Sequence, residues 1–197
     1  RFLAFIGLPL SVLLYFTAGE VTLILFGDQW MPSIPIFRIL TLSVGIQIVL
    51  SSSGSIFQAA GDTKSLFVCG LFSSVLNVAG ILLGIFRIGT LQAVATCITL
   101  TFTVNFVQCY WMMYRVTLHR SLRHFAVQLV SPLAVSVLLI AVLYPLSLLT
   151  EGGNIFLTLI VKSIIFFCIF GCYIQLTGEY DIIGKAKGIL NKRKSRG

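Results

Sequence analysis

Charged residues, and acidic ones above all, are scarce in this chain. Only 10% of its 197 residues are charged, with 6 Asp and Glu against 14 Lys and Arg, whereas 57% are hydrophobic. Soluble domains carry about 25% charged residues, and a soluble domain this apolar would have more apolar surface than it could bury. Together with a mean hydropathy of +1.01, this composition excludes a soluble globular domain and predicts a membrane protein.

Reactive side chains are also missing from the apolar segments. The acidic residues stand at predicted loops or helix ends, and they are Glu20, Asp28, Asp62, Glu151, Glu179 and Asp181. The only histidines, His119 and His124, share a basic turn that has no acidic residue. The segment therefore lacks the carboxylates that an intramembrane hydrolase or a carboxylate proton relay needs, and we do not expect an enzyme.

The five cysteines all lie within predicted membrane spans. Cys168 and Cys172 share a helix face, but no His or carboxylate stands near them in the sequence to complete a metal site. A thiol in this setting packs as a small apolar residue. We therefore expect neither a metal site nor a cofactor.

What the chain does contain is a series of six long apolar runs. Each approaches the length of about 20 residues that crosses a bilayer core. They cover Phe2–Ala18, Ile34–Phe57, Ser65–Phe86, Thr90–Tyr114, Phe125–Leu149 and Gly153–Thr177. The sequence thus predicts an all-α membrane protein with six transmembrane helices. Gly80 and Gly84 form a G-x-x-x-G pair, which predicts close packing of the third of these helices.

The basic residues predict the orientation of these helices. Between them, the connections Glu20–Ser33, Arg87–Gly89 and Thr150–Gly152 contain a single Lys or Arg, whereas the other loops and the C-terminal tail contain most of the rest. Because short cytoplasmic loops are rich in Lys and Arg, we expect both ends of the segment in the cytoplasm. The net charge of +8 therefore belongs to helix ends on one membrane face, and we do not expect nucleic-acid binding.

The first connection predicts a structured element at the outer surface. The stretch Glu20–Gly27 is apolar but too short to span, which indicates a short interfacial helix that begins near Glu20 and ends at Gly27. Trp30 is then expected at headgroup depth. Pro32 and Pro35 would restart the chain into the second span.

Residue 1 is Arg, and an apolar run follows at once. We expect residues 1–177 to form one six-helix lobe of a longer protein whose N-terminal lobe is absent, as in transporters built from repeated halves. Residues 178–197 alternate apolar positions with a basic cluster, which predicts an amphipathic cytoplasmic tail that binds anionic membrane lipids.

Four segments in the first third of the chain resemble a known family. They are Phe5–Leu10 (FIGLPL), Leu23–Trp30 (LILFGDQW), Pro35–Leu40 (PIFRIL) and Ser55–Lys64 (SIFQAAGDTK). In order and spacing they are similar to the C-terminal half of Wzx-type polysaccharide exporters, which belong to the multidrug, oligosaccharidyl-lipid and polysaccharide (MOP) exporter superfamily.

This resemblance implies one lobe of a two-lobed, MATE-like transporter in a bacterial inner membrane. The lobes would face each other across a cavity that opens alternately to each side. The implied substrate is an undecaprenyl-diphosphate-linked oligosaccharide, flipped to the periplasmic leaflet for O-antigen, capsule or exopolysaccharide synthesis.

Polar residues within the spans are the candidates for such a cavity. They are Lys162, Arg38, Gln47, Ser51, Gln58 and Asn77. Spacings of four and seven place Gln47, Ser51 and Gln58 on one helix face. This polar stripe fits a cavity wall, and hydrogen bonding between helices explains it equally well.

Lys162 is the sharpest of these candidates. Counted from Gly153 at 1.5 Å per residue, it lies about 13 Å deep, near the middle of a core about 30 Å thick. A lysine facing lipid there costs at least about 2.5–3.5 kcal/mol, and the sequence indicates no acid within these spans to neutralise it. We therefore expect it to face a hydrated cavity, with pairing to an acid of the absent lobe or snorkelling as alternatives. Arg38 is expected only about 6 Å deep, where it can reach the outer headgroups.

Two other functions stay open from the sequence. A drug or small-molecule antiporter of the same superfamily commonly needs an intramembrane acid, which the predicted spans lack. A membrane-embedded glycosyl- or acyltransferase of cell-envelope synthesis would need reactive groups at the cytoplasmic face, where only Asp62, Glu179, Asp181 and the two histidines are available.

Overall fold

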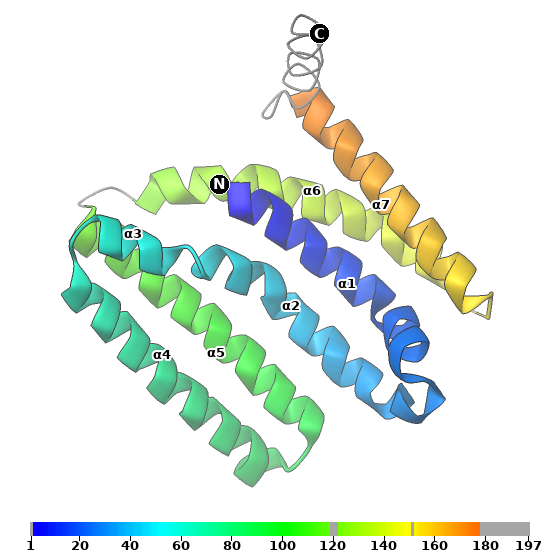
Figure 1. The fold of residues 1–197 in the computed structure, drawn as a ribbon, viewed down its shortest axis with the longest axis horizontal. Coiled ribbons are helices and arrows are strands. Elements are labelled where there is room, and N and C mark those ends of the chain that lie inside the picture. Colours follow the sequence, from blue (N-terminus) through cyan, green and yellow to red (C-terminus); the bar gives the residue numbers. More distant parts are fainter. Residues whose placement is uncertain (1, 119–121, 151, 178–197) are drawn as a thin grey trace, which may run out of the picture.

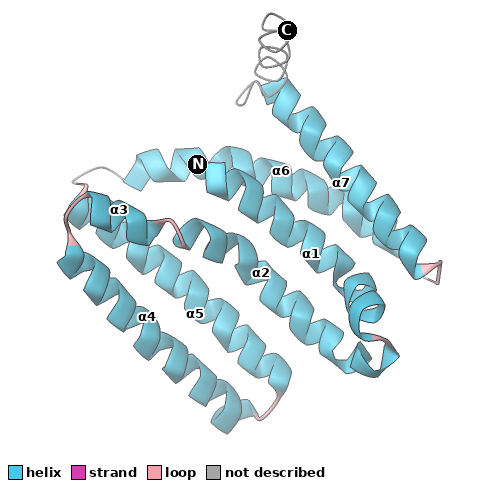
Figure 2. Cartoon of the chain, in the orientation of Figure 1, coloured by secondary structure: helices cyan, strands magenta, loops and turns pink. Residues whose placement is uncertain are grey.

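A computed structural model describes residues 2–118, 122–150 and 152–177 of the chain. These residues form helices and short connections, and no strand occurs among them (Figures 1 and 2). The predicted amphipathic tail at residues 178–197 lies outside the described residues, as do His119 and Glu151.

The six predicted spans are confirmed as helices. The elements in chain order are α1 (Phe2–Phe26), η1 (Asp28–Ser33), α2 (Ile34–Leu50), α3 (Ser53–Ala59), α4 (Thr63–Leu83), η2 (Gly84–Ile88), α5 (Leu91–Met112), η3 (Met113–Thr117), α6 (Leu122–Leu149) and α7 (Ile155–Thr177). In the described residues, six helical segments are long and apolar enough to cross a membrane. By length and composition, the chain is a multi-pass membrane protein.

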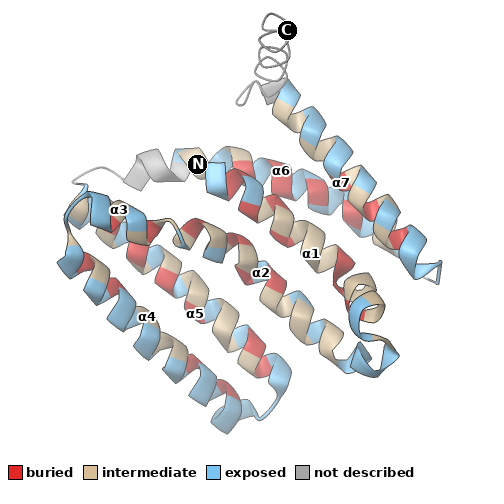
Figure 3. Ribbon diagram, in the orientation of Figure 1, coloured by how far each residue is buried: buried red, intermediate tan, exposed pale blue. Residues whose placement is uncertain are grey.

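The helices pack in a layered order that leaves α1 and α2 in the middle (Figure 1). Helix α1 packs on α2, α6 and α7, while α2 also packs on α5, and α4 lies against α5 at the far edge. The ring of Phe5 in α1 lies 5.4 Å from that of Phe170 in α7. Buried residues follow the inner faces of α1, α2 and α5, whereas α4 is largely exposed (Figure 3), as expected of a helix that faces lipid.

Small residues allow the closest helix contacts. A Cβ atom added at Gly45 of α2 would lie 2.8 Å from the backbone oxygen of Gly7 in α1. A Cβ at Gly80 would lie 2.5 Å from the side chain of Thr101, and one at Gly84 would lie 2.8 Å from the Cα of Val94. The close packing predicted from the G-x-x-x-G pair is thus confirmed, and its partner is α5.

The structure differs from the sequence prediction at the first connection. We expected a separate interfacial helix beginning near Glu20, but α1 continues through that residue to Phe26. Gly19 does not interrupt the helix, and the helix ends only at Gly27, whose φ of 83° is left-handed. The prediction of a separate helix is therefore wrong, and Glu20 lies inside the first candidate span. Trp30 follows in η1 and is exposed.

The second span is interrupted, which the sequence analysis did not anticipate. Helix α2 ends at Leu50 and α3 begins at Ser53. The hydroxyls of Ser51, Ser52 and Ser53 each donate to the backbone carbonyl three residues earlier. Such local bonds compete with the helical pattern, and three in succession accompany this break.

A tight turn joins α3 to α4. Gly61 has a φ of 72°, and Asp62 caps α4 by accepting from the backbone N–H of Ser65 at 3.0 Å. Its other carboxylate oxygen accepts from the hydroxyl of Thr117 at 2.6 Å. Hydrogen bonds from Ser65 and then Thr117 favour the ionised carboxylate and lower the pKa of Asp62.

Candidate functional site

A cavity of about 400 Å³ opens between α1, α2, α6 and α7. It lies near the end of the bundle that carries η1 and the turn from α6 to α7, which we call the η1 end. Charged and polar side chains from all four helices reach it, namely Glu20, Arg38, Tyr144, Ser147, Thr150, Thr158 and Lys162. Of the six residues predicted from the sequence, Lys162 and Arg38 line this cavity together.

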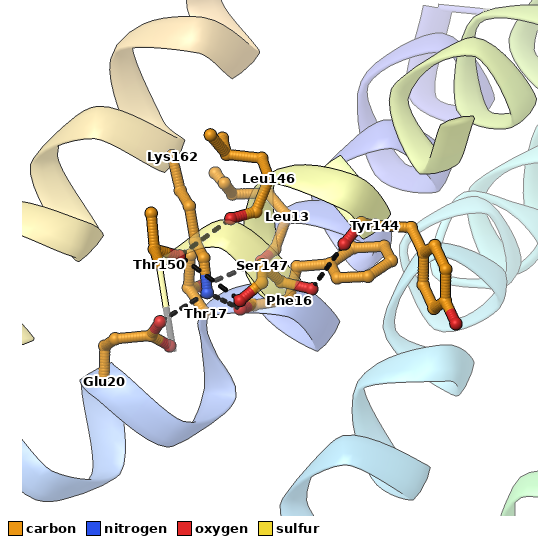
Figure 4. A network of polar contacts seen from close by, with 9 residues as sticks. All are labelled: Leu13, Phe16, Thr17, Glu20, Tyr144, Leu146, Ser147, Thr150 and Lys162. Atoms are coloured by element: carbon orange, nitrogen blue, oxygen red, sulfur yellow. Dashed lines mark hydrogen bonds and ion pairs between the residues drawn. The ribbon is translucent and has the colours of Figure 1, made fainter. Parts of the chain in front are cut away.

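Lys162 extends from α7 onto α1 (Figure 4). Its Nζ donates to the backbone carbonyl oxygen of Phe16 at 3.0 Å and forms an ion pair with Oε1 of Glu20. Only 5% of the Lys162 side chain is exposed, against 14% for Glu20. Helix packing thus removes most water from the Lys162 side chain, and the carboxylate of Glu20 balances its charge.

The two partners lie at matching depth. Glu20 stands six residues before the end of α1 at Phe26, and Lys162 stands seven after the start of α7 at Ile155. At 1.5 Å per residue, these offsets correspond to about 9 and 10.5 Å along the two helices. Opposite charges attract strongly in a low-dielectric environment, and this pair links α7 to α1.

This pair corrects two sequence predictions. We expected that no acid within the spans could neutralise Lys162, and we placed Glu20 at a helix end. Because α1 continues past Glu20, its carboxylate lies inside the span and meets the lysine. Lys162 lines the cavity, but as one half of an ion pair.

Arg38 provides the second cation of the cavity. It belongs to α2 and is exposed, and its guanidinium lies beside Gly19, where an added Cβ would be 3.8 Å from it. None of the described residues forms an ion pair with Arg38. Arg38, Lys162 and Glu20 together give the cavity a formal charge of +1.

Hydroxyl groups from the end of α6 and the turn after it form the wall beside the ion pair (Figure 4). The hydroxyl of Ser147 donates to the carbonyl of Tyr144 at 2.7 Å, and that of Thr150 donates to Leu146 at 2.8 Å. Since each proton is already donated within the helix, the oxygens keep lone pairs that accept hydrogen bonds. The cavity therefore combines cations for an anionic group with acceptors for hydroxyl donors.

The other predicted residues lie away from this cavity. Gln47, Ser51 and Gln58 are exposed on α2, α3 and the break between them. The side-chain amide of Gln47 donates to Ser43 at 2.8 Å within its own helix. Asn77 accepts from Thr101 at 2.8 Å and so joins α4 to α5, which is the alternative role that we gave to polar residues in the spans.

Comparisons of the chain with protein-family models, with curated proteins and with solved structures found no match. The similarity to polysaccharide exporters therefore depends on the four sequence segments alone.

Proposed function

We propose that this chain is the C-terminal lobe of a flippase for undecaprenyl-diphosphate-linked oligosaccharides in a bacterial inner membrane. The observation that supports this proposal best is the meeting of Lys162 and Arg38 in one polar cavity among membrane-spanning helices. A sugar diphosphate is anionic and rich in hydroxyls. It needs a hydrated path with cations through hydrocarbon, and such a cavity would supply part of one.

The proposed role is assigned to particular side chains. The diphosphate would approach Arg38, which carries a positive charge without an ion-pair partner among the described residues, and then Lys162. The sugar hydroxyls would donate to the oxygens of Ser147 and Thr150. The exposed polar face with Gln47, Ser51 and Gln58 would line the wall toward the second lobe, because polar groups facing lipid are costly.

A deletion strain tests the function of the whole protein. Loss of a flippase should make the lipid-linked glycan accumulate on the cytoplasmic leaflet while its synthesis continues. Thin-layer analysis of extracted lipid-linked glycans would measure this. Absence of the glycan itself would instead favour a transferase and contradict the flippase proposal.

A residue-level test must respect the ion pair. Lys162→Gln alone would leave the partly buried Glu20 carboxylate without its partner and lower the amount of folded protein. The double variant Glu20→Gln/Lys162→Gln removes both charges and should restore abundance but not flipping, whereas Lys162→Arg should retain more activity. Full transport by the double variant at normal abundance would show that Lys162 does not contact the substrate.

The antiporter gains one specific observation as the second candidate. Glu20 is an acid within a candidate span and faces the cavity, which is the kind of group that cation coupling uses. Drug transport by membrane vesicles that depends on a cation gradient and is lost in Glu20→Gln would favour this candidate. Among the described side chains the transferase gains no such support, because Asp62 is engaged by Ser65 and Thr117.

A further inference from the structure

The lysine proposed to meet the substrate already holds an anion of the protein itself. Lys162 has three N–H donors, of which one points to Phe16 and one to Glu20. An incoming anionic group must therefore share Lys162 with the Glu20 carboxylate or displace it. Arg38, by contrast, is exposed and has no such competitor among the described residues.

We infer that Glu20 is a specificity-determining residue. A polyanionic diphosphate lipid displaces its carboxylate from Lys162, whereas a monoanionic phospholipid does not. This inference depends on the proposed function only in that the cavity takes an anionic lipid headgroup. It adds a residue that discriminates between headgroups, and it predicts movement of one carboxylate.

The charges of the cavity give the reason. A phosphodiester lipid carries one negative charge, which Arg38 alone can balance, so the pair of Glu20 and Lys162 stays closed. A diphosphate ester carries two or more negative charges on adjacent groups, so it can engage Arg38 and still compete for Lys162. The repulsion between its second phosphate and Glu20 then favours release of the carboxylate.

Selection of this kind is needed in a membrane. Monoanionic phospholipids vastly outnumber any lipid-linked sugar, so a cavity with two unpaired cations would be filled by bulk lipid. A competing internal carboxylate penalises the wrong headgroup, which is how specificity arises from a difference between affinities. The buried position of the pair strengthens this penalty, because the charges are little screened by water or salt.

The first experiment measures headgroup selectivity in the full-length protein, purified into nanodiscs of zwitterionic phosphatidylcholine. The probe is a fluorescent farnesyl diphosphate, and the competitor is dioleoyl phosphatidylglycerol. The quantity compared is the selectivity ratio, the affinity for unlabelled farnesyl diphosphate divided by that for phosphatidylglycerol. In Glu20→Gln we expect this ratio to fall about tenfold, because phosphatidylglycerol competes better. Glu20→Asp keeps the carboxylate and should have the same selectivity ratio as the native protein.

Asp28→Asn is the matched control. Asp28 lies at the same η1 end and lines a neighbouring cavity with Leu23 and Gly153, but it does not line the cavity of Lys162. Its loss removes one negative charge from the same region, so the selectivity should stay unchanged. If the selectivity ratio fell equally in Asp28→Asn and in Glu20→Gln, the effect would come from general surface charge, and the inference would be overturned.

A second measurement uses the native protein and does not require any variant to fold. Carbodiimide labelling with mass spectrometry reports how accessible each carboxylate is. Farnesyl diphosphate should increase labelling of Glu20 by several fold, whereas phosphatidylglycerol should not, and Asp28 should react equally in both. Equal labelling of Glu20 with both lipids would refute the displacement, even where glycan accumulation in the deletion strain supports the flippase.

Discussion

The ion pair between α1 and α7 allows a quantitative prediction about stability. Lys162 is 4% exposed, so removal of Glu20 leaves a buried ammonium with the carbonyl of Phe16 as its remaining hydrogen-bond acceptor among the described residues. Breaking a buried pair from one side costs about 3–5 kcal/mol. We expect the lower end for Glu20→Gln, because the amide oxygen can still accept from Lys162, and the upper end for Lys162→Leu.

The two sites should be strongly coupled. In Glu20→Leu/Lys162→Leu no charge is stranded, and apolar replacement of a buried pair is often nearly neutral. The double variant should therefore be more stable than Lys162→Leu, with a coupling energy of about 2–4 kcal/mol. Reversible unfolding by SDS titration in mixed micelles gives the free energy for each corner of this double-mutant cycle. Single losses that add to within about 0.5 kcal/mol would show that the pair does not hold α7 to α1.

Three further predictions concern other parts of the fold. Gly45→Val should destabilise the protein by about 1–3 kcal/mol in the same titration, because its Cβ would enter the backbone of α1, whereas Gly70→Val, with open space around it, should be near neutral. Thr117→Val should raise the pKa of Asp62, which Ser65 and Thr117 now hold below its usual range. A carboxylate whose pKa is lowered by folding stabilises the protein at pH values above its unfolded-state pKa, and this contribution is lost as the pH falls. Because Thr117→Val makes that contribution smaller, the midpoint of acid unfolding should move to higher pH. A cysteine in place of Asp28, in a background without native thiols, should react with an impermeant maleimide in intact spheroplasts, and protection there would reverse the proposed orientation.

The helices were predictable from the sequence because lipid imposes a simple rule. A span of hydrocarbon needs about 20 apolar residues, and each of the six runs meets it without help from distant parts of the chain. The bounds were less predictable, as the two errors show. The helix continues through Glu20 because a single glycine, Gly19, costs a helix only about 1 kcal/mol. The break after Leu50 coincides with three successive serines whose hydroxyls bond to backbone carbonyls.

The site was only half predictable. Charge within a span identified Lys162, because a lysine among apolar residues is visible in the sequence of one helix. Its partner is 142 residues away in the chain and required the placement of α7 against α1. One signal was available in the sequence: the apolar run continues past Glu20 to Phe26, which would have placed this acid inside the first span, as Lys162 is inside the last predicted one. Comparing the depths of opposite charges would have suggested the pair.

The separation of the paired charges along the chain bears on how the protein is made. Glu20 leaves the ribosome with the first of the six candidate spans, and its counter-ion emerges only with the sixth. Helix α7 has the highest mean hydropathy of the six candidate spans. This hydrophobicity offsets the cost of inserting a lysine through the translocon before it meets its partner. Helix α7 can thus insert on its own sequence, and its docking onto α1 brings the two charges together.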